Sequence, residues 1–313
     1  MRFSIAIPAY KPNYLAEAVA SVLAQTFSDW ELVVVDDCSP ADLRSIVVPF
    51  LADSRVRYYR NEKNYGAINL VDNWNHCLEY CTGDFVICMG DDDRLLPNGL
   101  MDLSEIIVRH PGLGVYHMQT EIIDQNGKRW KVLPQRPELE SALDLLDRRW
   151  RKGSMQFIGD FCFDLGRLRE AGGFFWMPLA WGSDDISAFL AAKEGIANTQ
   201  HVGFQYRFSS VSISNNRENE LKFVTLMQVA DWFADTLDAY QAPAGEERKL
   251  VNLKSRLRQH FNRLCEDYVI SDIGNRPSAL GSWIRHRRKY GLSTARIFYL
   301  AIKGLLFRMM GRI

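Results

Sequence analysis

The chain has 313 residues, of which 47% are hydrophobic and 12% aromatic, and it carries 38 basic and 38 acidic side chains. This length allows one large domain or two modest ones with a sizeable core, and the composition excludes a disordered chain. Residues 285–313 hold eight Lys or Arg and no acidic residue, so the rest has a net charge of minus eight, which argues against nucleic acid as a partner.

The first 119 residues alternate between strand and helix patterns. Apolar and β-branched runs predict strands at residues 2–8, 30–35, 56–59, 85–89 and 113–118. Apolar residues at helical spacing predict helices between them, at residues 14–25, 43–51, 70–81 and 100–108. Strands separated by helices of this length indicate an α/β fold with a mostly parallel sheet and right-handed crossovers.

The pattern changes after residue 119. The Asn126-Gly127 pair predicts a hairpin turn within residues 121–131. The sequence next predicts a strand at residues 155–163, a helix at residues 185–193 and a strand at residues 200–208. Long helical segments follow, at residues 221–239, 246–269 and 277–290. We therefore expect two domains, an α/β domain at residues 1–215 and a helical region at residues 216–313.

Three consecutive carboxylates, Asp91-Asp92-Asp93, follow the apolar run at residues 85–89 and precede the helix expected from Pro97. Adjacent carboxylates repel one another, and nothing basic precedes them on the strand, so a cation best explains the cluster. Oxygen ligands suit Mg²⁺ or Mn²⁺, which usually bind through one or two carboxylates plus substrate phosphates. This pattern points to phosphate-ester or nucleotide-sugar chemistry.

Polar or aromatic residues also follow the first two strands. Tyr10 comes at the end of the first strand, and Asp36-Asp37 come at the end of the second. In a parallel sheet, ligands bind beyond the carboxyl ends of the strands, so one crevice can hold these residues together with the three aspartates. The Tyr10 ring can stack on a nucleobase; the alternative is a tyrosine that caps the sheet edge.

Four segments, taken in order and spacing, resemble family 2 glycosyltransferases. They are IAIPAY (5–10), SVLAQT (21–26), ELVVVDDCS (31–39), and GDFV (83–86) with DDD (91–93). The resemblance covers about residues 1–215. It implies the Rossmann-like A-type glycosyltransferase fold with a C-terminal helical extension, a nucleotide-sugar donor, Mn²⁺ or Mg²⁺ as cofactor, and inversion at the anomeric carbon.

The resemblance places the nucleotide against the ends of the first two strands. Pro8, Ala9 and Tyr10 would line the nucleotide, and Asp37 would accept a hydrogen bond from the base. Gly66, in a segment similar to the family's Asn-x-Gly, would border the nucleotide with its backbone. Helix capping is the alternative for Asp37. The neighbouring Asp36 is expected to be structural or to share the contact with the base.

For the acidic cluster, the resemblance implies that Asp92 is the metal ligand, with Asp93 beside it, and that Asp91 lies against the donor ribose. The family's commonest pattern is Asp-x-Asp-Asp, and here Gly90 occupies the position of the first aspartate. This departure leaves open how the three aspartates divide their roles. A cluster that only caps the following helix would need one aspartate and not three.

A second carboxylate pair, Asp184-Asp185, opens the helix expected at residues 185–193. In the family such a pair supplies the general base, which takes the proton of the acceptor hydroxyl as its oxygen attacks the anomeric carbon. Alignment of the apolar residues that follow favours Asp185, and Asp184 stays a candidate. The alternative is that both aspartates only complement the helix dipole.

Two further groups would contact the substrates. Arg207 matches a basic position that contacts the donor pyrophosphate in relatives, and arginine binds phosphate bidentately. The alternative is an exposed arginine on an edge strand. Residues 172–174, with Trp176 and Trp181, are expected to form the floor of the acceptor site, although core packing explains these aromatics nearly as well.

The last residues predict a basic amphipathic helix. One face of the segment at residues 293–312 carries four apolar residues, Phe298, Ile302, Leu305 and Met309. No uncharged run reaches the roughly 18–20 residues that a membrane span needs. Such a helix could lie on an anionic leaflet, which would bring peripheral membrane contact through residues 285–313 and a lipid-linked acceptor. A helix packed on its own domain explains the pattern equally well.

We therefore predict a metal-dependent inverting glycosyltransferase that moves a sugar from a UDP-sugar or another nucleotide-sugar to a glycan or lipid-linked glycan in bacterial surface polysaccharide synthesis. One rival is a non-catalytic nucleotide- or glycan-binding scaffold. Another is a sugar-phosphate nucleotidyltransferase, which would need a glycine-rich loop after the first strand. The chain opens with a strand and shows no signal peptide, so the expected location is the cytoplasm, at the inner face of the membrane if the tail binds lipid.

Overall fold

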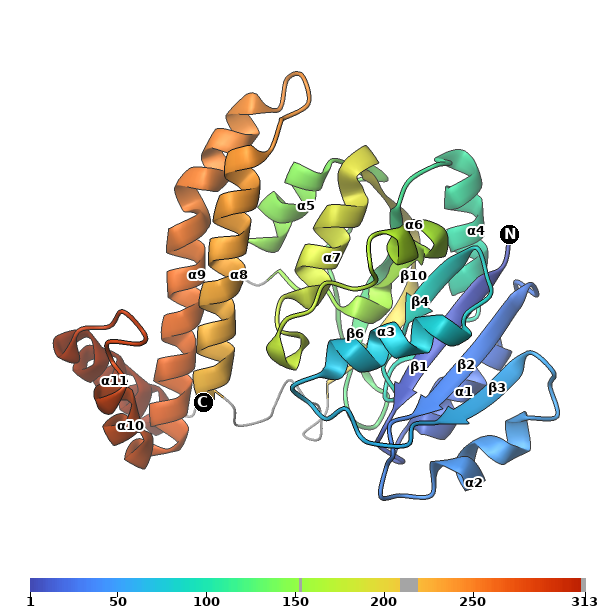
Figure 1. Cartoon of the computed structure of the whole chain (residues 1–313), viewed down its shortest axis with the longest axis horizontal. Helices are drawn as coiled ribbons and strands as arrows, with labels where there is room; N and C mark the ends of the chain where they lie inside the picture. The colour runs from blue at the N-terminus through green and yellow to red at the C-terminus, as the bar shows by residue number, and fades with distance from the viewer. Residues whose placement is uncertain (152–153, 209–218, 311–313) are drawn as a thin grey trace. The chain divides into compact units, whose positions relative to one another are not determined.

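The computed structural model describes residues 1–151, 154–208 and 219–310. The chain forms two compact units, Met1–Ser212 and Ile213–Ile313. The first is a sheet flanked by helices, and the second is helical (Figure 1). The boundary predicted after residue 215 falls within residues 209–218, outside the described residues, and stays a prediction.

Ten strands of the described chain form one sheet. They are β1 (Phe3–Ala9), β2 (Trp30–Asp36), β3 (Val56–Arg60), β4 (Phe85–Cys88), β5 (Arg94–Leu95), β6 (Val115–Ile123), β7 (Arg129–Val132), β8 (Leu139–Glu140), β9 (Phe161–Asp164) and β10 (Ile196–Arg207). Their order is β3-β2-β1-β4-β9-β6-β10-β5, with β7 beside β6 and β8 beside β10. The neighbours β3, β2, β1 and β4 run parallel, as do β6 and β10. The predicted α/β class is confirmed.

Helices cover both faces of this sheet. The helices of the first unit are α1 (Leu15–Leu23), α2 (Leu43–Val47), α3 (Leu70–Tyr80), α4 (Gly99–Arg109), α5 (Ala142–Arg149), α6 (Leu165–Glu170) and α7 (Ser183–Ala191). Because side chains alternate along a strand, Phe3, Ile5 and Ile7 of β1 point to one face. There they form a core with Val19 of α1 and Leu103 of α4, whereas α3 lies on the opposite face (Figure 1).

The strand predicted at residues 155–163 is mostly wrong. The structure has a 3₁₀ turn at Ile158–Asp160, and only then β9. The Asp160 carboxylate accepts a hydrogen bond from the backbone N–H of Phe157 at 3.2 Å, which closes the turn. A Cβ atom at Gly159 would lie 2.6 Å from the Phe204 ring, so the turn packs closely against β10.

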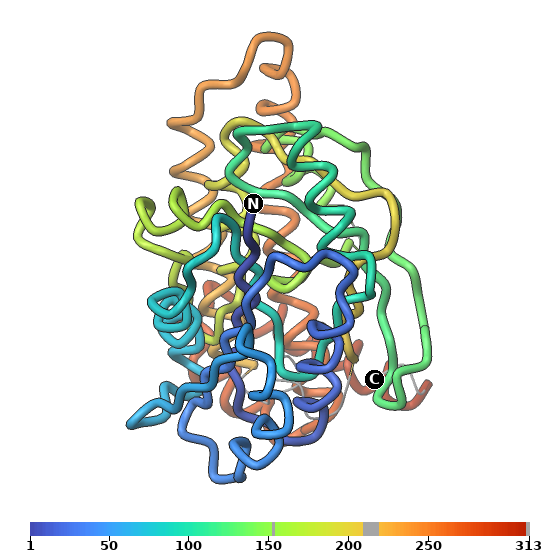
Figure 2. Tube along the Cα trace, turned by 90° about the vertical axis from the view of Figure 1, so that its right-hand side faces the viewer, coloured from blue at the N-terminus to red at the C-terminus, as the bar shows by residue number. Residues whose placement is uncertain are grey.

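The second unit consists of α8 (Asn219–Ala239), α9 (Glu247–Asn275), α10 (Leu280–Arg285) and α11 (Thr294–Met309). The loop that joins α8 to α9 lies at the top of both views (Figures 1 and 2). The helix predicted at residues 277–290 is too long, because α10 ends at Arg285 and the following turns lead to Gly291 at φ +62°. Among the described residues, no helix has the length and apolarity needed to cross a bilayer.

Candidate active site

Asp91 ties the carboxyl end of β1 to that of β4. Its Oδ2 accepts hydrogen bonds from the backbone N–H groups of Tyr10 at 2.8 Å and Lys11 at 2.7 Å. The Tyr10 side chain is 44% exposed, whereas Ala9 before it is buried and Pro8 is half-buried. The predicted nucleotide segment and the acidic cluster therefore meet at one point, with an exposed aromatic ring beside it.

The carboxylate of Asp37 follows β2 and is held by three donors. It accepts hydrogen bonds from Asn61 Nδ2 at 2.9 Å, Asn64 Nδ2 at 3.0 Å and the backbone N–H of Tyr65 at 3.0 Å. The loop continues to Gly66, whose φ of +75° favours glycine. A carboxylate offers about four acceptor positions, so a contact with the base stays a prediction. No sequence pattern indicated that Asn61 would bind this carboxylate.

Asp36 is fully buried and serves the fold. It accepts hydrogen bonds from the Tyr58 hydroxyl at 2.6 Å and the backbone N–H of Ser39 at 2.7 Å, and it forms a close ion pair with Arg60. Burial and the hydrogen bond to Asp36 raise the pKa of Tyr58 to about 12. These contacts agree with the structural role expected for Asp36.

Lys11 supplies a positive charge that the strand preceding the aspartates lacks. Its Nζ lies 2.6 Å from Asp92 Oδ2 and 3.2 Å from Asp91 Oδ1. Burial alone would lower the pKa of Lys11, but the two carboxylates outweigh it and hold the pKa above its ordinary value. No sequence pattern indicated this residue, because it reaches the cluster from the segment after β1 and not from β4.

Asp93 is bound by the backbone of β10. It is buried, and its Oδ1 accepts a hydrogen bond from the backbone N–H of Arg207 at 2.9 Å. Burial, followed by the charge of Asp92, raises the pKa of Asp93 well above its ordinary value. A Cβ atom at Gly90 would lie 2.8 Å from Asp93 Oδ2, so the glycine leaves room for this carboxylate. Of the two predicted metal ligands, Asp93 is thus bound by β10, and the role of Asp92 stays a prediction.

Arg207 is buried inside the sheet, and the alternative of an exposed edge-strand arginine is wrong. Its strand, β10, lies between β6 and β5, and its side chain is 1% exposed. Nε donates to the carbonyl oxygen of Asp92 at 2.7 Å, and Nη2 pairs with Glu17 at 2.7 Å. The guanidinium thus binds the backbone of the acidic cluster. Its contacts give no support to the predicted pyrophosphate contact.

The second carboxylate pair opens α7, and its two members differ. Asp185 Oδ1 accepts hydrogen bonds from Arg149 Nε at 2.7 Å and Gln156 Nε2 at 2.8 Å. Burial, followed by the charge of Asp185, raises the pKa of Asp184 to about 8. Asp185 is thus the member of the pair that two side-chain donors orient, and its role as the base stays a prediction.

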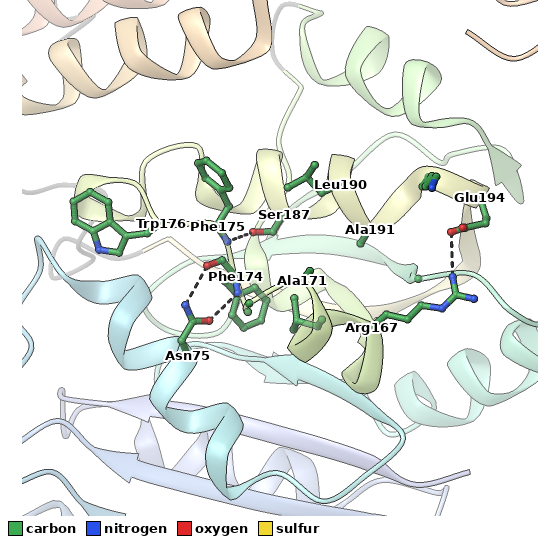
Figure 3. Close-up of a pocket in the computed structure, with 15 residues that line it drawn as sticks. Asn75, Arg167, Ala171, Phe174, Phe175, Trp176, Ser187, Leu190, Ala191 and Glu194 are labelled. Atoms are coloured by element: carbon green, nitrogen blue, oxygen red, sulfur yellow. Dashed lines mark hydrogen bonds and ion pairs between the residues drawn. The ribbon is translucent and has the colours of Figure 1, made fainter. Parts of the chain in front are cut away.

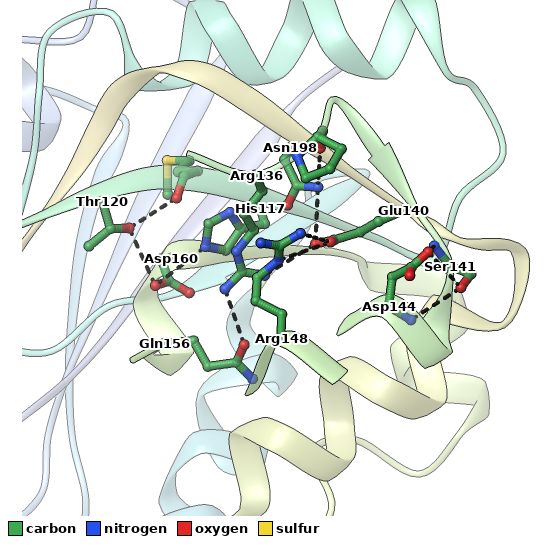
Figure 4. Close-up of polar contacts among 12 residues, drawn as sticks. His117, Thr120, Arg136, Glu140, Ser141, Asp144, Arg148, Gln156, Asp160 and Asn198 are labelled. Carbon is green, nitrogen blue, oxygen red and sulfur yellow. Dashed lines mark hydrogen bonds and ion pairs between the residues drawn. The ribbon is translucent and has the colours of Figure 1, made fainter. Parts of the chain in front are cut away.

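Gln156 links Asp185 to a buried polar cluster (Figure 4). Its Oε1 accepts a hydrogen bond from Arg136 Nη2 at 3.1 Å. Arg136 in turn lies 3.6 Å from Glu140, and burial raises the pKa of the nearby Asp160 to about 7. Because a guanidinium only donates hydrogen bonds, this contact turns the Gln156 oxygen toward Arg136 and its NH₂ group toward Asp185. No sequence pattern indicated this arrangement.

A stacked aromatic pair joins the segment that holds Asp185 to the strand that holds the acidic cluster. The rings of Phe157 and Tyr206 are nearly parallel, with centroids 3.6 Å apart. Phe157 follows Gln156, which holds Asp185, and Tyr206 precedes Arg207, which holds the acidic cluster. The first unit therefore positions both groups from neighbouring segments.

The predicted acceptor floor lines a separate hollow. Residues 172–174 and Trp176 border a cavity of about 460 Å³ along α6 and α7 (Figure 3). Neither Trp181 nor the carboxylates of the two groups are among the described residues that line it. Trp176 is 43% exposed, so contact with a sugar ring stays a prediction.

The acidic cluster fits a divalent cation that arrives with phosphate. Within the described ranges, no group of three or more His, Cys, Asp or Glu side chains forms a complete metal site. The Asp92 side chain is 12% exposed, whereas that of Asp91 is 3% exposed. Mg²⁺ and ions like it bind through one or two carboxylates and complete their coordination with water and substrate phosphates.

Known proteins share the sequence pattern of this unit. Residues 4–171 match the family described as Glycosyl transferase family 2. The chain is 29% identical over 225 residues to UDP-Glc:alpha-D-GlcNAc-diphosphoundecaprenol beta-1,3-glucosyltransferase WfgD of Escherichia coli, over 70% of this chain and 82% of WfgD. With several other relatives, the alignment covers less than half of the relative's own length.

Solved structures of low identity share the fold. TarS 1-349 of S. aureus, in complex with UDP-GlcNAc, superposes with a TM-score of 0.57 at 16% identity, covering 100% of this chain and 93% of that chain. Mannosyltransferase PcManGT of Pyrobaculum calidifontis, in complex with GDP-Man and Mn²⁺, gives 0.56 at 15% identity, covering 97% and 87%. The A-type glycosyltransferase fold expected from the sequence is confirmed.

Proposed function

The chain belongs to glycosyl transferase family 2, and from this we propose that it transfers a sugar from a nucleotide-sugar, with UDP as the favoured nucleotide, to a hydroxyl of a glycan or lipid-linked glycan. The observation that carries the proposal is the pair of carboxylate groups, with Asp92 at the crevice and Asp185 oriented by two donors. The donor and acceptor named for WfgD, UDP-Glc and a diphosphoundecaprenol-linked sugar, support the substrate class.

The donor nucleotide would bind where β1, β2 and β4 end. The exposed Tyr10 ring offers a stacking face for the base, and Asp37 lies on the loop after the neighbouring strand. Asp91 keeps the Tyr10 and Lys11 backbone in place through its two hydrogen bonds. These residues would therefore bind and orient the nucleotide without taking part in bond breaking.

Transfer would proceed by a single displacement. The acceptor hydroxyl oxygen forms a bond to the anomeric carbon as the bond to the nucleoside diphosphate breaks on the opposite face, which inverts the configuration. Asp185 takes the hydroxyl proton, and Arg149 and Gln156 keep its carboxylate oriented while it does so. Mn²⁺ or Mg²⁺ held at Asp92 would stabilise the negative charge that develops on the departing diphosphate.

Calorimetric binding of UDP, GDP, CDP and dTDP, with and without Mn²⁺, tests the proposal on the wild type and on Asp92→Ala. We expect one diphosphate to bind in a Mn²⁺-dependent manner, and the variant to lose that dependence. Binding of no nucleotide would refute the donor assignment and favour the non-catalytic scaffold. The nucleotidyltransferase alternative has less support, because Pro8-Ala9-Tyr10 stands where a glycine-rich loop would be.

We also propose that the second unit contacts the membrane at its cytoplasmic face. The four residues of the predicted apolar face of α11 are all exposed, namely Phe298, Ile302, Leu305 and Met309. The segment that contains them, residues 285–313, has eight basic and no acidic residues. An apolar face flanked by positive charge is the combination that binds anionic leaflets, and it would bring the enzyme to a lipid-linked acceptor.

A further inference from the structure

The ammonium group of Lys11 lies where a cation bound to Asp92 would lie. Nζ is 2.6 Å from Asp92 Oδ2 and 3.2 Å from Asp91 Oδ1, so a single positive charge bridges the two carboxylates. Asp93 Oδ1 instead accepts a hydrogen bond from the backbone N–H of Arg207. The chain thus carries its own counter-ion at the position expected for the divalent metal.

We propose that Lys11 competes with the divalent cation for Asp92, and thereby makes metal binding depend on the nucleoside diphosphate. This inference rests on the proposed function, because it assumes that both ligands meet at this crevice. Lys11 would control the order in which the divalent cation and the nucleoside diphosphate bind, and how strongly each affects the other. It would take no part in the displacement itself.

The competition follows from geometry and charge. A carboxylate oxygen that accepts a hydrogen bond from an ammonium group at 2.6 Å cannot offer the same lone pair to a metal ion. A dication approaching Asp92 would also face the positive charge of Nζ at close range. The Lys11 backbone cannot withdraw, since its N–H is bound to Asp91 at 2.7 Å. Only the flexible four-carbon stem can move the ammonium group aside.

The donor diphosphate would relieve the competition. Its oxygens offer the ammonium group a new anionic partner next to the crevice, and the Lys11 side chain is 20% exposed and so can reach solvent-filled space. Once Nζ moves to phosphate, Asp92 Oδ2 becomes available to the metal ion and the repulsion by the ammonium charge decreases. Because binding free energies are linked, the metal must then increase nucleotide affinity by the same factor.

Titration of Mn²⁺ into the full chain, with and without UDP, tests this inference on wild type, Lys11→Met and Lys11→Arg. Without UDP, we expect Lys11→Met to bind Mn²⁺ at least about tenfold more tightly than wild type, which corresponds to about 1.4 kcal/mol. Lys11→Arg keeps the charge and should bind Mn²⁺ as weakly as wild type. UDP should enhance Mn²⁺ binding less in Lys11→Met than in wild type. Lys193→Met, which removes an exposed lysine remote from the cluster, is the matched control.

Equal or weaker Mn²⁺ binding by Lys11→Met without UDP would overturn the inference, while binding of Mn²⁺ and UDP by wild type would still uphold the proposed function. If wild type binds Mn²⁺ neither alone nor with UDP, both proposals fail. Removal of the lysine leaves neighbouring carboxylates without their counter-ion, so Lys11→Met could be unstable. In that case Mn²⁺ should raise the melting temperature of Lys11→Gln more than that of wild type, and an equal rise would reject the inference.

Discussion

The two aspartates at the start of α7 have the same side chain and different surroundings. Asp185 receives two hydrogen bonds on one oxygen, from Arg149 and Gln156. At Asp184, burial and the adjacent charge of Asp185 instead raise the pKa to about 8, so this carboxyl holds its proton more readily than an exposed aspartate. Under the proposed function, these different surroundings assign the proton-accepting role to Asp185.

Asp185→Asn should lower kcat by about 10²–10⁴-fold, since an amide cannot take the proton of the acceptor hydroxyl. UDP and Mn²⁺ should bind as to the wild type, because the substitution keeps the shape of the side chain. Asp184→Asn is the matched control and should keep most of the activity. Steady-state transfer rates and calorimetry provide the two measurements, and unchanged turnover of Asp185→Asn would contradict the assignment of the base.

Stability should fall as pH rises from about 4 to about 8. The pKa of Asp184 is near 3.8 when the side chain is exposed and about 8 in the folded state, so across this window the folded chain binds the extra proton. The unfolding free energy then decreases with pH and levels off above the folded pKa. Asp184→Asn should flatten this dependence in thermal unfolding measured across the window. A slope as steep as that of wild type would show that other groups cause it.

At the level of the helix, the face of α11 that is buried differs from the apolar face that the sequence predicted. Its predicted apolar face is exposed, with Met309 at 83%. The buried face instead carries Ile297, Leu300, Ala301 and Gly304. At Gly304 an added Cβ atom would lie 2.4 Å from the carbonyl oxygen of Ile270, so α11 and α9 cross in close backbone contact. The helix is apolar on two sides, and only one of them packs within its unit.

Gly304→Ala should destabilise the second unit by about 1–3 kcal/mol, because the new methyl group meets backbone that cannot rotate away. Helix propensity alone would favour alanine by about 0.5–1 kcal/mol. Gly281→Ala in α10 is the control, since no described heavy atom lies within 4 Å of its added Cβ. Urea unfolding followed by circular dichroism should thus give shifts of opposite sign. Similar shifts for the two variants would contradict the close crossing.

Most elements could be predicted because β1, β2 and β6 are buried on both faces and read as continuous apolar runs, whereas helices such as α4 bury one face at helical spacing. The predicted hairpin turn at Asn126-Gly127 is confirmed, for example, with the Gly127 N–H donating to Asp124 O at 2.9 Å. The acidic cluster could be found because its three residues are adjacent in the sequence. Lys11 and Gln156 could not be found, since each reaches its carboxylate from a distant segment and only the folded chain brings them together.

On the scale of the whole chain, the charge asymmetry and the exposed face of α11 concern the same segment. We expect the protein to float with vesicles that contain anionic lipid and not with phosphatidylcholine vesicles, with each basic residue near the surface contributing about 1 kcal/mol. Substitution of Phe298, Ile302 and Met309 by Ser should abolish flotation. This triple variant is sharper than deletion of residues 285–313, which would also remove the buried face of α11.

Val251→Ser, at a position 63% exposed on α9, is the control for the loss of surface apolarity and should float like wild type. Flotation should weaken as salt is added, because screening reduces attraction to the anionic leaflet. If the triple variant floats as well as wild type, the exposed face of α11 is not a lipid-binding surface.

The short strand β9 sets the distance between β4 and β6. It lies antiparallel between β4 and β6, so these two strands are separated by two interstrand spacings, about 10 Å. The acidic cluster follows β4, whereas Arg149 and Gln156, which orient Asp185, belong to the excursion between β6 and β10. Insertions in the segment between β6 and β10 can reshape the surface offered to an acceptor. The distance between β4 and β6 stays constant, because β9 lies between them. Under the proposed function, acceptor choice can thus diverge among relatives while the spacing between β4 and β6 stays the same.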